Sequence, residues 1–313
     1  MIRGGDNLWI KGGLIYTPNV ELEWAKTHAM QPVPLYIGDG IVRIFFASLD
    51  GEGVGRIGYV DVDEINPKKI LKISERPVLD IGRPGAFDDN GVVPGTVLRV
   101  QNLLYLYYGG YQIGTKVRYF QFIGLAVSRD NGNSFKRYSE VPIVDRSKNE
   151  MFGRTGPFVM FDDNRFKMWY SAWNKWVLDG NKPVPNYIQR YMESEDGINW
   201  PKNGLVSFRP NGRGEYGIGK SFVFKDNGIY KMYYSVRLYS KGYRIGYAES
   251  KDGREWQRKN QKSMINTSSR GWDSEMLLYP YIYSRNRNTY MFYNGNEFGK
   301  SGFGFFRQEV DKK

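Results

Sequence analysis

A pair of adjacent aromatic residues recurs five times along this chain, at intervals of about 60 residues. Each pair lies near the end of an apolar segment, which follows another apolar segment and a polar turn. The pairs are Phe45 and Phe46, Tyr107 and Tyr108, Trp169 and Tyr170, Tyr233 and Tyr234, and Phe292 and Tyr293. Because the repeat runs through all 313 residues, it predicts one array of similar units, a single domain over residues 1–313.

Each unit has a second half with a turn of its own. A third apolar segment precedes the turns at residues 128–132, 194–197 and 250–253, and their Asn-Gly and Asp-Gly sequences favour tight hairpins. Four strands in each of five units predict an all-β chain, a five-bladed β-propeller with four antiparallel strands per blade. We expect residues 8–16 to supply the outermost strand of the last blade. Asp50 and Gly51 follow the second strand directly and predict a shorter outer half in the first blade.

Composition excludes several classes of protein. The chain has no Cys, which excludes disulfides and thiol catalysis, and it has no apolar run long enough to span a membrane. Residues 1–13 lack the apolar core of a signal peptide, so a cytoplasmic location is predicted. The net charge is +12, but basic residues such as Lys167 and Lys231 are scattered singly. A solvated basic surface is therefore expected rather than a nucleic-acid site, with an anionic substrate as the alternative.

The ends of the first strands mark the expected site, because the funnel of a propeller lies where the first strand of each blade begins. Five residues before Pro94 and Pro280 stand Asp89 and Glu275. Convergent carboxylates suit glycosidic bond cleavage, in which one protonates the leaving oxygen and the other is the base or nucleophile. We predict Asp89, Glu275 and Asp88 as catalytic residues, although each could equally be a turn or cap residue.

Further residues near the strand ends are predicted to bind substrate. Lys220, Arg154 and Arg237 would hold an anionic group, and exposed aromatic faces would stack on sugar rings. The full set is His28, Gln31, Arg154, Trp173, Glu215, Lys220, Arg237, Asp273, Asn294 and Asn296. His28 is the one histidine, so no histidine-rich metal centre is expected. No metal site and no cofactor are predicted, and a cation held by carboxylates alone stays an open alternative.

Four segments resemble a known family. They are residues 87–94, 243–253, 272–280 and 290–299, with the sequences FDDNGVVP, YRIGYAESKDG, WDSEMLLYP and YMFYNGNEFG. The chain is similar to the five-bladed propellers of glycoside hydrolase families 32, 43, 68 and 130. It most resembles predicted glycosidase-like proteins found with bacterial surface-polysaccharide genes, which are related to the N-terminal domain of plant glucosamine inositolphosphorylceramide transferases. Gln31 stands where family 43 enzymes have an Asp, so their carboxylate set does not transfer residue by residue.

The resemblance and the carboxylates together predict a glycan-active enzyme. It would hydrolyse or transfer a glycosidic linkage in surface-polysaccharide metabolism. The alternative is a non-catalytic sugar-binding propeller that positions a glycan or sugar nucleotide for a partner glycosyltransferase. A phosphorolytic or nucleotide-sugar enzyme is a third hypothesis. The expected ligand is a carbohydrate or sugar nucleotide, with no nucleic acid and no membrane span, and the sequence sets no oligomeric state.

Overall fold

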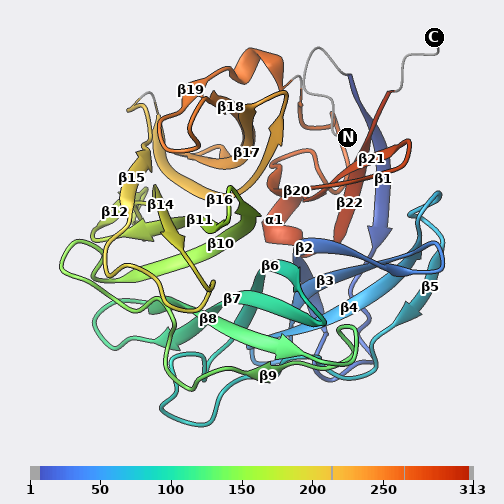
Figure 1. Ribbon diagram of the computed structural model, residues 1–313, viewed down its shortest axis with the longest axis horizontal. Coiled ribbons are helices and arrows are strands. Elements are labelled where there is room, and N and C mark those ends of the chain that lie inside the picture. The colour runs from blue at the N-terminus through green and yellow to red at the C-terminus, as the bar shows by residue number, and fades with distance from the viewer. Residues whose placement is uncertain (1–7, 213, 264, 310–313) are drawn as a thin grey trace.

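The computed structural model describes residues 8–212, 214–263 and 265–309, and its regular secondary structure is almost entirely β-strand (Figure 1). The strands fall into five groups of four, and each predicted aromatic pair lies on the second strand of its group. The groups are β2 (Thr27–Gly38), β3 (Ile41–Leu49), β4 (Gly55–Asp63) and β5 (Ile70–Ile73); β6 (Val92–Val100), β7 (Leu103–Ile113), β8 (Tyr119–Ser128) and β9 (Lys136–Arg137); β10 (Gly153–Asp162), β11 (Arg165–Trp173), β14 (Ile188–Ser194) and β15 (Leu205–Phe208); β16 (Glu215–Asp226), β17 (Ile229–Leu238), β18 (Gly242–Ser250) and β19 (Gln257–Arg258); and β20 (Leu278–Arg285), β21 (Asn288–Asn294), β22 (Phe303–Gln308) and β1 (Trp9–Tyr16).

Neighbouring strands within each group pair in antiparallel fashion. The second and third groups are joined by one parallel pairing, between Gly153 and Gln121, and so form a single eight-stranded sheet. The elements outside these groups are the hairpin of β12 (Trp176–Asp179) and β13 (Lys182–Pro185), the 3-10 helix η1 (Asn260–Lys262) and the short helix α1 (Asn296–Gly299). No helix in the described part of the chain is long and apolar enough to cross a membrane.

The two ends of the chain meet in one sheet. β1 pairs antiparallel with β22, from Trp9 opposite Gln308 to Tyr16 opposite Phe303. This pairing confirms the prediction that residues 8–16 supply the outermost strand of the last group. The prediction of a shorter outer half in the first group is wrong. Asp50 and Gly51 form the turn between the second and third strands, and the third strand, β4, pairs with β3 along its whole length.

The first strands of the groups contact one another in a cycle around the middle of the molecule (Figure 1). β2 contacts β6, β6 contacts β10, β10 contacts β16, β16 contacts β20, and β20 contacts β2. In the third and fourth groups, the serine that follows the aromatic pair links its group to the next one. Ser171 Oγ donates to the Ile218 carbonyl at 2.9 Å, and Ser235 Oγ accepts from the Tyr279 amide at 2.8 Å. A serine at this position therefore joins neighbouring groups, whereas Ala47 and Gly109 stand there in the first two groups.

The aromatic pairs form the core between the sheets. The second member of every pair is fully buried, and Phe158, Phe222 and Tyr281 meet near the middle with ring centroids 4.8–5.9 Å apart. Burying rings of this size contributes a large share of the hydrophobic stabilisation. A repeat made of aromatic pairs is therefore a repeat of core positions.

Local hydrogen bonds hold the turns between third and fourth strands. In one of them the Gly197 amide donates to Ser194 Oγ at 3.0 Å, and the Ile198 and Asn199 amides both donate to Asp196 Oδ1 at 2.8 Å. In all three turns the Ser hydroxyl donates to the Asp carboxylate two residues later. In the turns that begin at Ser128 and Ser250, a Gly amide again donates to the Ser Oγ. The Ser and Asp side chains of these turns therefore bond local backbone amides, which is a structural role.

Two lysines expected on the surface are buried. Lys167 and Lys231 are each 6% exposed, and each pairs at 2.6 Å with an aspartate across its own hairpin, Asp162 and Asp226 respectively. The sequence pattern suggested solvated positions because a lone lysine usually is solvated. The hairpin instead supplies a carboxylate at the end of the preceding strand, and a charge this deeply buried needs such a partner.

Candidate functional site

A buried carboxylate contacts the second aromatic residue of the pair in several groups. In the second group the Tyr108 hydroxyl donates to Asp88 Oδ2 at 2.9 Å, and Arg137 Nε donates to the same oxygen at 2.8 Å. The corresponding clusters are Glu150 with Tyr170 and Arg154, Glu215 with Arg258, which also contacts Tyr234, and Asp273 with Tyr293 and Lys11. These carboxylates thus occupy corresponding positions in their groups because each belongs to a repeated cluster of a carboxylate, a tyrosine and a cation.

The cluster accounts for three residues that the sequence placed in the site. Asp88, Glu215 and Asp273 each hold an internal ion pair, and their side chains are 0%, 7% and 4% exposed. A cation compensates each buried carboxylate, and a tyrosine hydroxyl also donates to Asp88 and to Asp273. These carboxylates therefore lie inside the protein rather than facing an open cavity.

The predicted catalytic pair lies nearer the surface. Asp89 is half-buried and its Oδ2 accepts from the Gly85 amide at 2.9 Å. Glu275 is exposed, and its amide donates to Asn296 Oδ1 at 2.8 Å. The Asn296 side chain also donates to the Gly271 carbonyl at 3.0 Å, so it holds the loop that carries Glu275.

Four other predicted binding residues are engaged in the interior. Arg154 pairs with Glu150 at 2.7 Å, and Lys220 Nζ donates to the Pro94 carbonyl at 3.0 Å, where burial lowers the lysine pKa well below its usual range. Two further side chains are almost wholly inaccessible: Trp173, packed between aromatic rings, and Asn294, which bonds the Ala29 carbonyl at 2.7 Å. None of the four offers a free face to a ligand.

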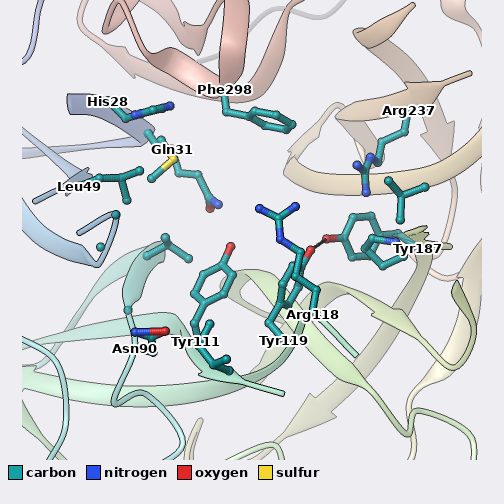
Figure 2. Close-up of a pocket in the computed structure, with 18 of the residues that line it drawn as sticks. His28, Gln31, Leu49, Asn90, Tyr111, Arg118, Tyr119, Tyr187, Arg237 and Phe298 are labelled. Atoms are coloured by element: carbon teal, nitrogen blue, oxygen red, sulfur yellow. Dashed lines mark hydrogen bonds between the residues drawn. The ribbon is translucent and has the colours of Figure 1, made fainter. Parts of the chain in front are cut away.

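One pocket of about 370 Å³ is lined by strand residues of four groups and, beside the third group, by the β12–β13 hairpin and Tyr187 (Figure 2). His28, Gln31 and Arg237 line it, so the structure brings together these three of the predicted site residues. The remaining wall includes Asn90, Tyr111, Arg118, Tyr119, Trp176, Lys182, Tyr187, Tyr243, Tyr279 and Phe298. Asn90 and Gly91, both in the wall, directly follow Asp89 in the chain.

Backbone strain gathers at the same pocket. His28, Gln31, Tyr279 and Phe298 all line it, and their φ angles are 62°, 57°, 57° and 61°. Such left-handed conformations are unfavourable for residues other than glycine, and they persist where surrounding bonds hold them. Here the Asn294 side chain accepts from the Gln31 amide at 2.7 Å. Strain concentrated at one cavity is typical of a functional site.

The pocket is rich in neutral hydrogen-bonding groups. Burial raises the pKa of the Tyr187 and Tyr279 phenols well above the usual range, so both are protonated at neutral pH. The Tyr119 and Tyr187 hydroxyls lie 3.4 Å apart, as the dashed line in Figure 2 shows. Burial, followed by the charge of Lys300, lowers the pKa of His28, so its imidazole is neutral at pH 7.

Several wall residues were missed from the sequence, although a signal existed. Tyr119, Tyr187 and Tyr243 stand at or next to the start of the third strand in three successive groups. Aligning the repeats on that strand start, and not only on the first strand, would have placed these tyrosines together. Lys182 lies on the β12–β13 hairpin, which has no counterpart in the other groups.

Metal binding has no support in the described residues. Across residues 8–212, 214–263 and 265–309, no group of three or more His, Asp or Glu side chains is arranged to hold a metal ion.

Comparison with known proteins adds relatives and a fold. No family model matches the chain. An uncharacterized protein of Mycobacterium tuberculosis, Rv1502, is 35% identical over 296 residues, which cover 95% of this chain and 97% of that protein. A 1,2-beta-oligomannan phosphorylase of a Thermoanaerobacter species is 24% identical over 209 residues, 66% of this chain and 64% of the enzyme. The solved structure of a glycoside hydrolase superposes with a TM-score of 0.76 at 17% identity, covering 96% of this chain and 92% of that one. The expected glycosidase-type fold is thereby confirmed.

Proposed function

The chain belongs to the same family as Rv1502 of Mycobacterium tuberculosis, and from this premise we propose that it is a glycan-active enzyme. In this proposal it hydrolyses or transfers a glycosidic linkage in surface-polysaccharide metabolism. The observation that carries the proposal is the pocket, in which aromatic rings and neutral hydrogen-bonding groups meet in a chain with the fold of a glycoside hydrolase. Flat rings beside polar groups suit a sugar, which has both apolar faces and hydroxyls.

We further propose that the five groups are the blades of one five-bladed propeller and that the pocket is its funnel. Two features support this arrangement: the cycle of contacts between first strands, and the pairing of β1 with β22. The pocket takes Gln31, Tyr111, Arg237 and Tyr279 from four of the groups, and Trp176 from the hairpin that connects two strands of the third group. The kinship with plant glucosamine inositolphosphorylceramide transferases is a further part of the proposal.

Asp89 and Glu275 are the carboxylate pair of the proposed mechanism. One would protonate the leaving oxygen and the other would act as base or nucleophile. Both are accessible, unlike Asp88, and Asp89 directly precedes wall residues of the pocket. The reacting linkage would then lie at the rim, with part of the glycan inside the pocket.

A non-catalytic sugar-binding propeller is the second candidate. It is favoured by one observation: no aspartate or glutamate is among the described residues that line the pocket. Such a protein would position a glycan or sugar nucleotide for a partner glycosyltransferase. A phosphorylase is a variant of the first candidate, suggested by the Thermoanaerobacter relative, which is named 1,2-beta-oligomannan phosphorylase.

An NMR time course separates these candidates. The protein would be incubated with pooled oligosaccharides and nucleotide sugars, with and without inorganic phosphate, while saturation transfer and anomeric signals are recorded. New anomeric signals that disappear in Asp89→Asn and Glu275→Gln, but persist in the control Asp39→Asn on a distant hairpin, support the enzyme. Saturation transfer without turnover supports the binding protein. Full turnover by Asp89→Asn would remove that residue from the mechanism.

A further inference from the structure

Arg237 is a buried cation without a carboxylate partner. It lies on β17, is 7% exposed and lines the pocket. Its guanidinium carbon lies 4.8–5.1 Å from the ring centres of Tyr216, Tyr187 and Tyr243. Within the described residues no carboxylate pairs with it, and its Nε has no hydrogen-bond partner.

A second buried arginine, Arg43, has the carboxylate partner that Arg237 lacks in the described part of the chain. Arg43 is 4% exposed and also stacks on a tyrosine, with its guanidinium carbon 3.6 Å from the centre of the Tyr59 ring. Asp61 pairs with Arg43 through two bonds of 2.8 Å. A buried charge is costly unless a counter-charge and hydrogen bonds compensate it. Arg237 has the aromatic surroundings of Arg43 but faces an open cavity where Arg43 faces an aspartate.

The wall around Arg237 has the same sign of charge. Arg118 and Lys182 also line the pocket, both are exposed, and the described wall contains no acidic side chain. Figure 2 shows the Arg118 guanidinium pointing toward the middle of the cavity, between Gln31 and Tyr187. A concave site whose charged residues are all positive concentrates the electrostatic field and attracts an anion. The buried phenols near Arg237 are neutral and add donors rather than negative charge.

The opposite wall has a different character. Gln31 is 6% exposed, and its Oε1 has no hydrogen-bond partner among the described residues. In Figure 2 the Gln31 amide points into the cavity from the side of β2, across from Arg237. A free acceptor of this kind suits a hydroxyl donor. The pocket thus has a cationic wall and a neutral wall that accepts hydrogen bonds.

We propose that the pocket binds a sugar with an acidic substituent, whose anionic oxygens lie against Arg237 and Arg118 and whose hydroxyls face Gln31. This inference rests on the proposed glycan function and narrows it to acidic sugars. The acidic group is a phosphate ester or a carboxylate, because both present the planar or clustered oxygens that a guanidinium binds through paired hydrogen bonds.

Isothermal titration calorimetry with small probes tests the proposal. Glucose, glucuronic acid, glucose 6-phosphate and inorganic phosphate would be titrated into the wild-type protein. At least one acidic sugar should bind about tenfold to hundredfold more tightly than glucose, since a hydrogen bond to a charged group is typically worth that much. The acid that gains more identifies the substituent as phosphate ester or carboxylate.

Variants locate the effect. Arg237→Met should abolish the preference for the acidic sugar, and Arg118→Met, at an exposed position, should reduce it without affecting the fold. Arg287→Met removes the same charge from an exposed turn outside the pocket wall and should change nothing. Near-ultraviolet circular dichroism checks that Arg237→Met keeps its aromatic packing.

Each remaining outcome overturns the proposal. Equal binding of glucose and both acidic sugars would overturn it and leave the glycan function standing. Binding of inorganic phosphate while no sugar binds would overturn the proposal, because the pocket would then select the anion and not a sugar; the NMR time course tests the glycan function separately. Unchanged acid preference in both Arg237→Met and Arg118→Met would show that the anion binds elsewhere.

Discussion

Asp88→Asn tests whether the repeated carboxylate is structural. Asp88 is fully buried, and its Oδ2 accepts both the Tyr108 hydroxyl and Arg137 Nε, at 2.9 and 2.8 Å. The other oxygen, Oδ1, has no hydrogen-bond partner among the described residues. An asparagine amide must therefore place its NH₂ group either against two donors or at this position without a partner.

The expected cost follows from that geometry. Removing one partner of a buried ion pair typically costs about 3 to 5 kcal/mol, because the other charge stays buried. Asparagine keeps the size and one carbonyl acceptor, and Arg137 Nη2 also bonds the Asp80 carbonyl. We therefore expect Asp88→Asn to lower the free energy of unfolding by about 2 to 3 kcal/mol.

The neighbouring residue is the matched control. Asp89 is half-buried, and its side chain accepts the Gly85 amide, so Asp89→Asn should change stability by less than about 0.5 kcal/mol. Urea unfolding followed by tryptophan fluorescence and circular dichroism gives both values. The comparison requires that the free energy of unfolding depend on urea concentration with the same slope in each protein. If both variants unfold at the wild-type midpoint, Asp88 does not hold the buried pair and its role must lie elsewhere.

Three further changes test the fold. Gly246→Ala would put a Cβ 2.4 Å from Tyr234 Cζ and should cost about 1 to 3 kcal/mol, whereas Gly51→Ala, 3.8 Å from its nearest neighbour, should be close to neutral in the same urea assay. Burial raises the pKa of Asp196, but the Asn199 and Ile198 amides outweigh it and lower the pKa to about 2. The stability that this carboxylate contributes is therefore complete above about pH 4 and lost as the pH falls toward 2. Asp196→Asn should make the free energy of unfolding fall less steeply between these pH values. An unchanged pH dependence would contradict the lowered pKa. Deletion of residues 1–16 removes β1 and leaves β22 as an open edge, so light scattering should show association, and a stable monomer would argue against closure by β1.

The architecture could be predicted because the repeat determines it. The aromatic pairs mark core positions, and their spacing gave the strand groups and the role of residues 8–16. The first group was misjudged because Asp50 and Gly51 suit any tight turn, and sequence alone does not say which two strands that turn joins. Lys167 and Lys231 were misjudged because their aspartates are brought close only by the hairpin.

The site was harder to predict than the fold because repeat position and chemical role are different properties. Carboxylates at a common depth suggested a catalytic set, yet Asp88, Glu215 and Asp273 share that depth because each belongs to an internal ion-paired cluster that recurs in four of the groups. Where the same residue type recurs at the corresponding position of several groups, the structure of those groups is sufficient to explain it.

The position three residues after each aromatic pair shows the converse. It holds Leu49, Tyr111, Trp173, Arg237 and Asn296 in the successive groups. The first four stand on the second strands and Asn296 lies in α1, and Leu49, Tyr111 and Arg237 line the pocket. Their chemistry differs in every group, so no common structural requirement selects it. A charge such as that of Arg237, kept at a buried position where the repeat does not call for one, is best explained by a ligand that compensates it.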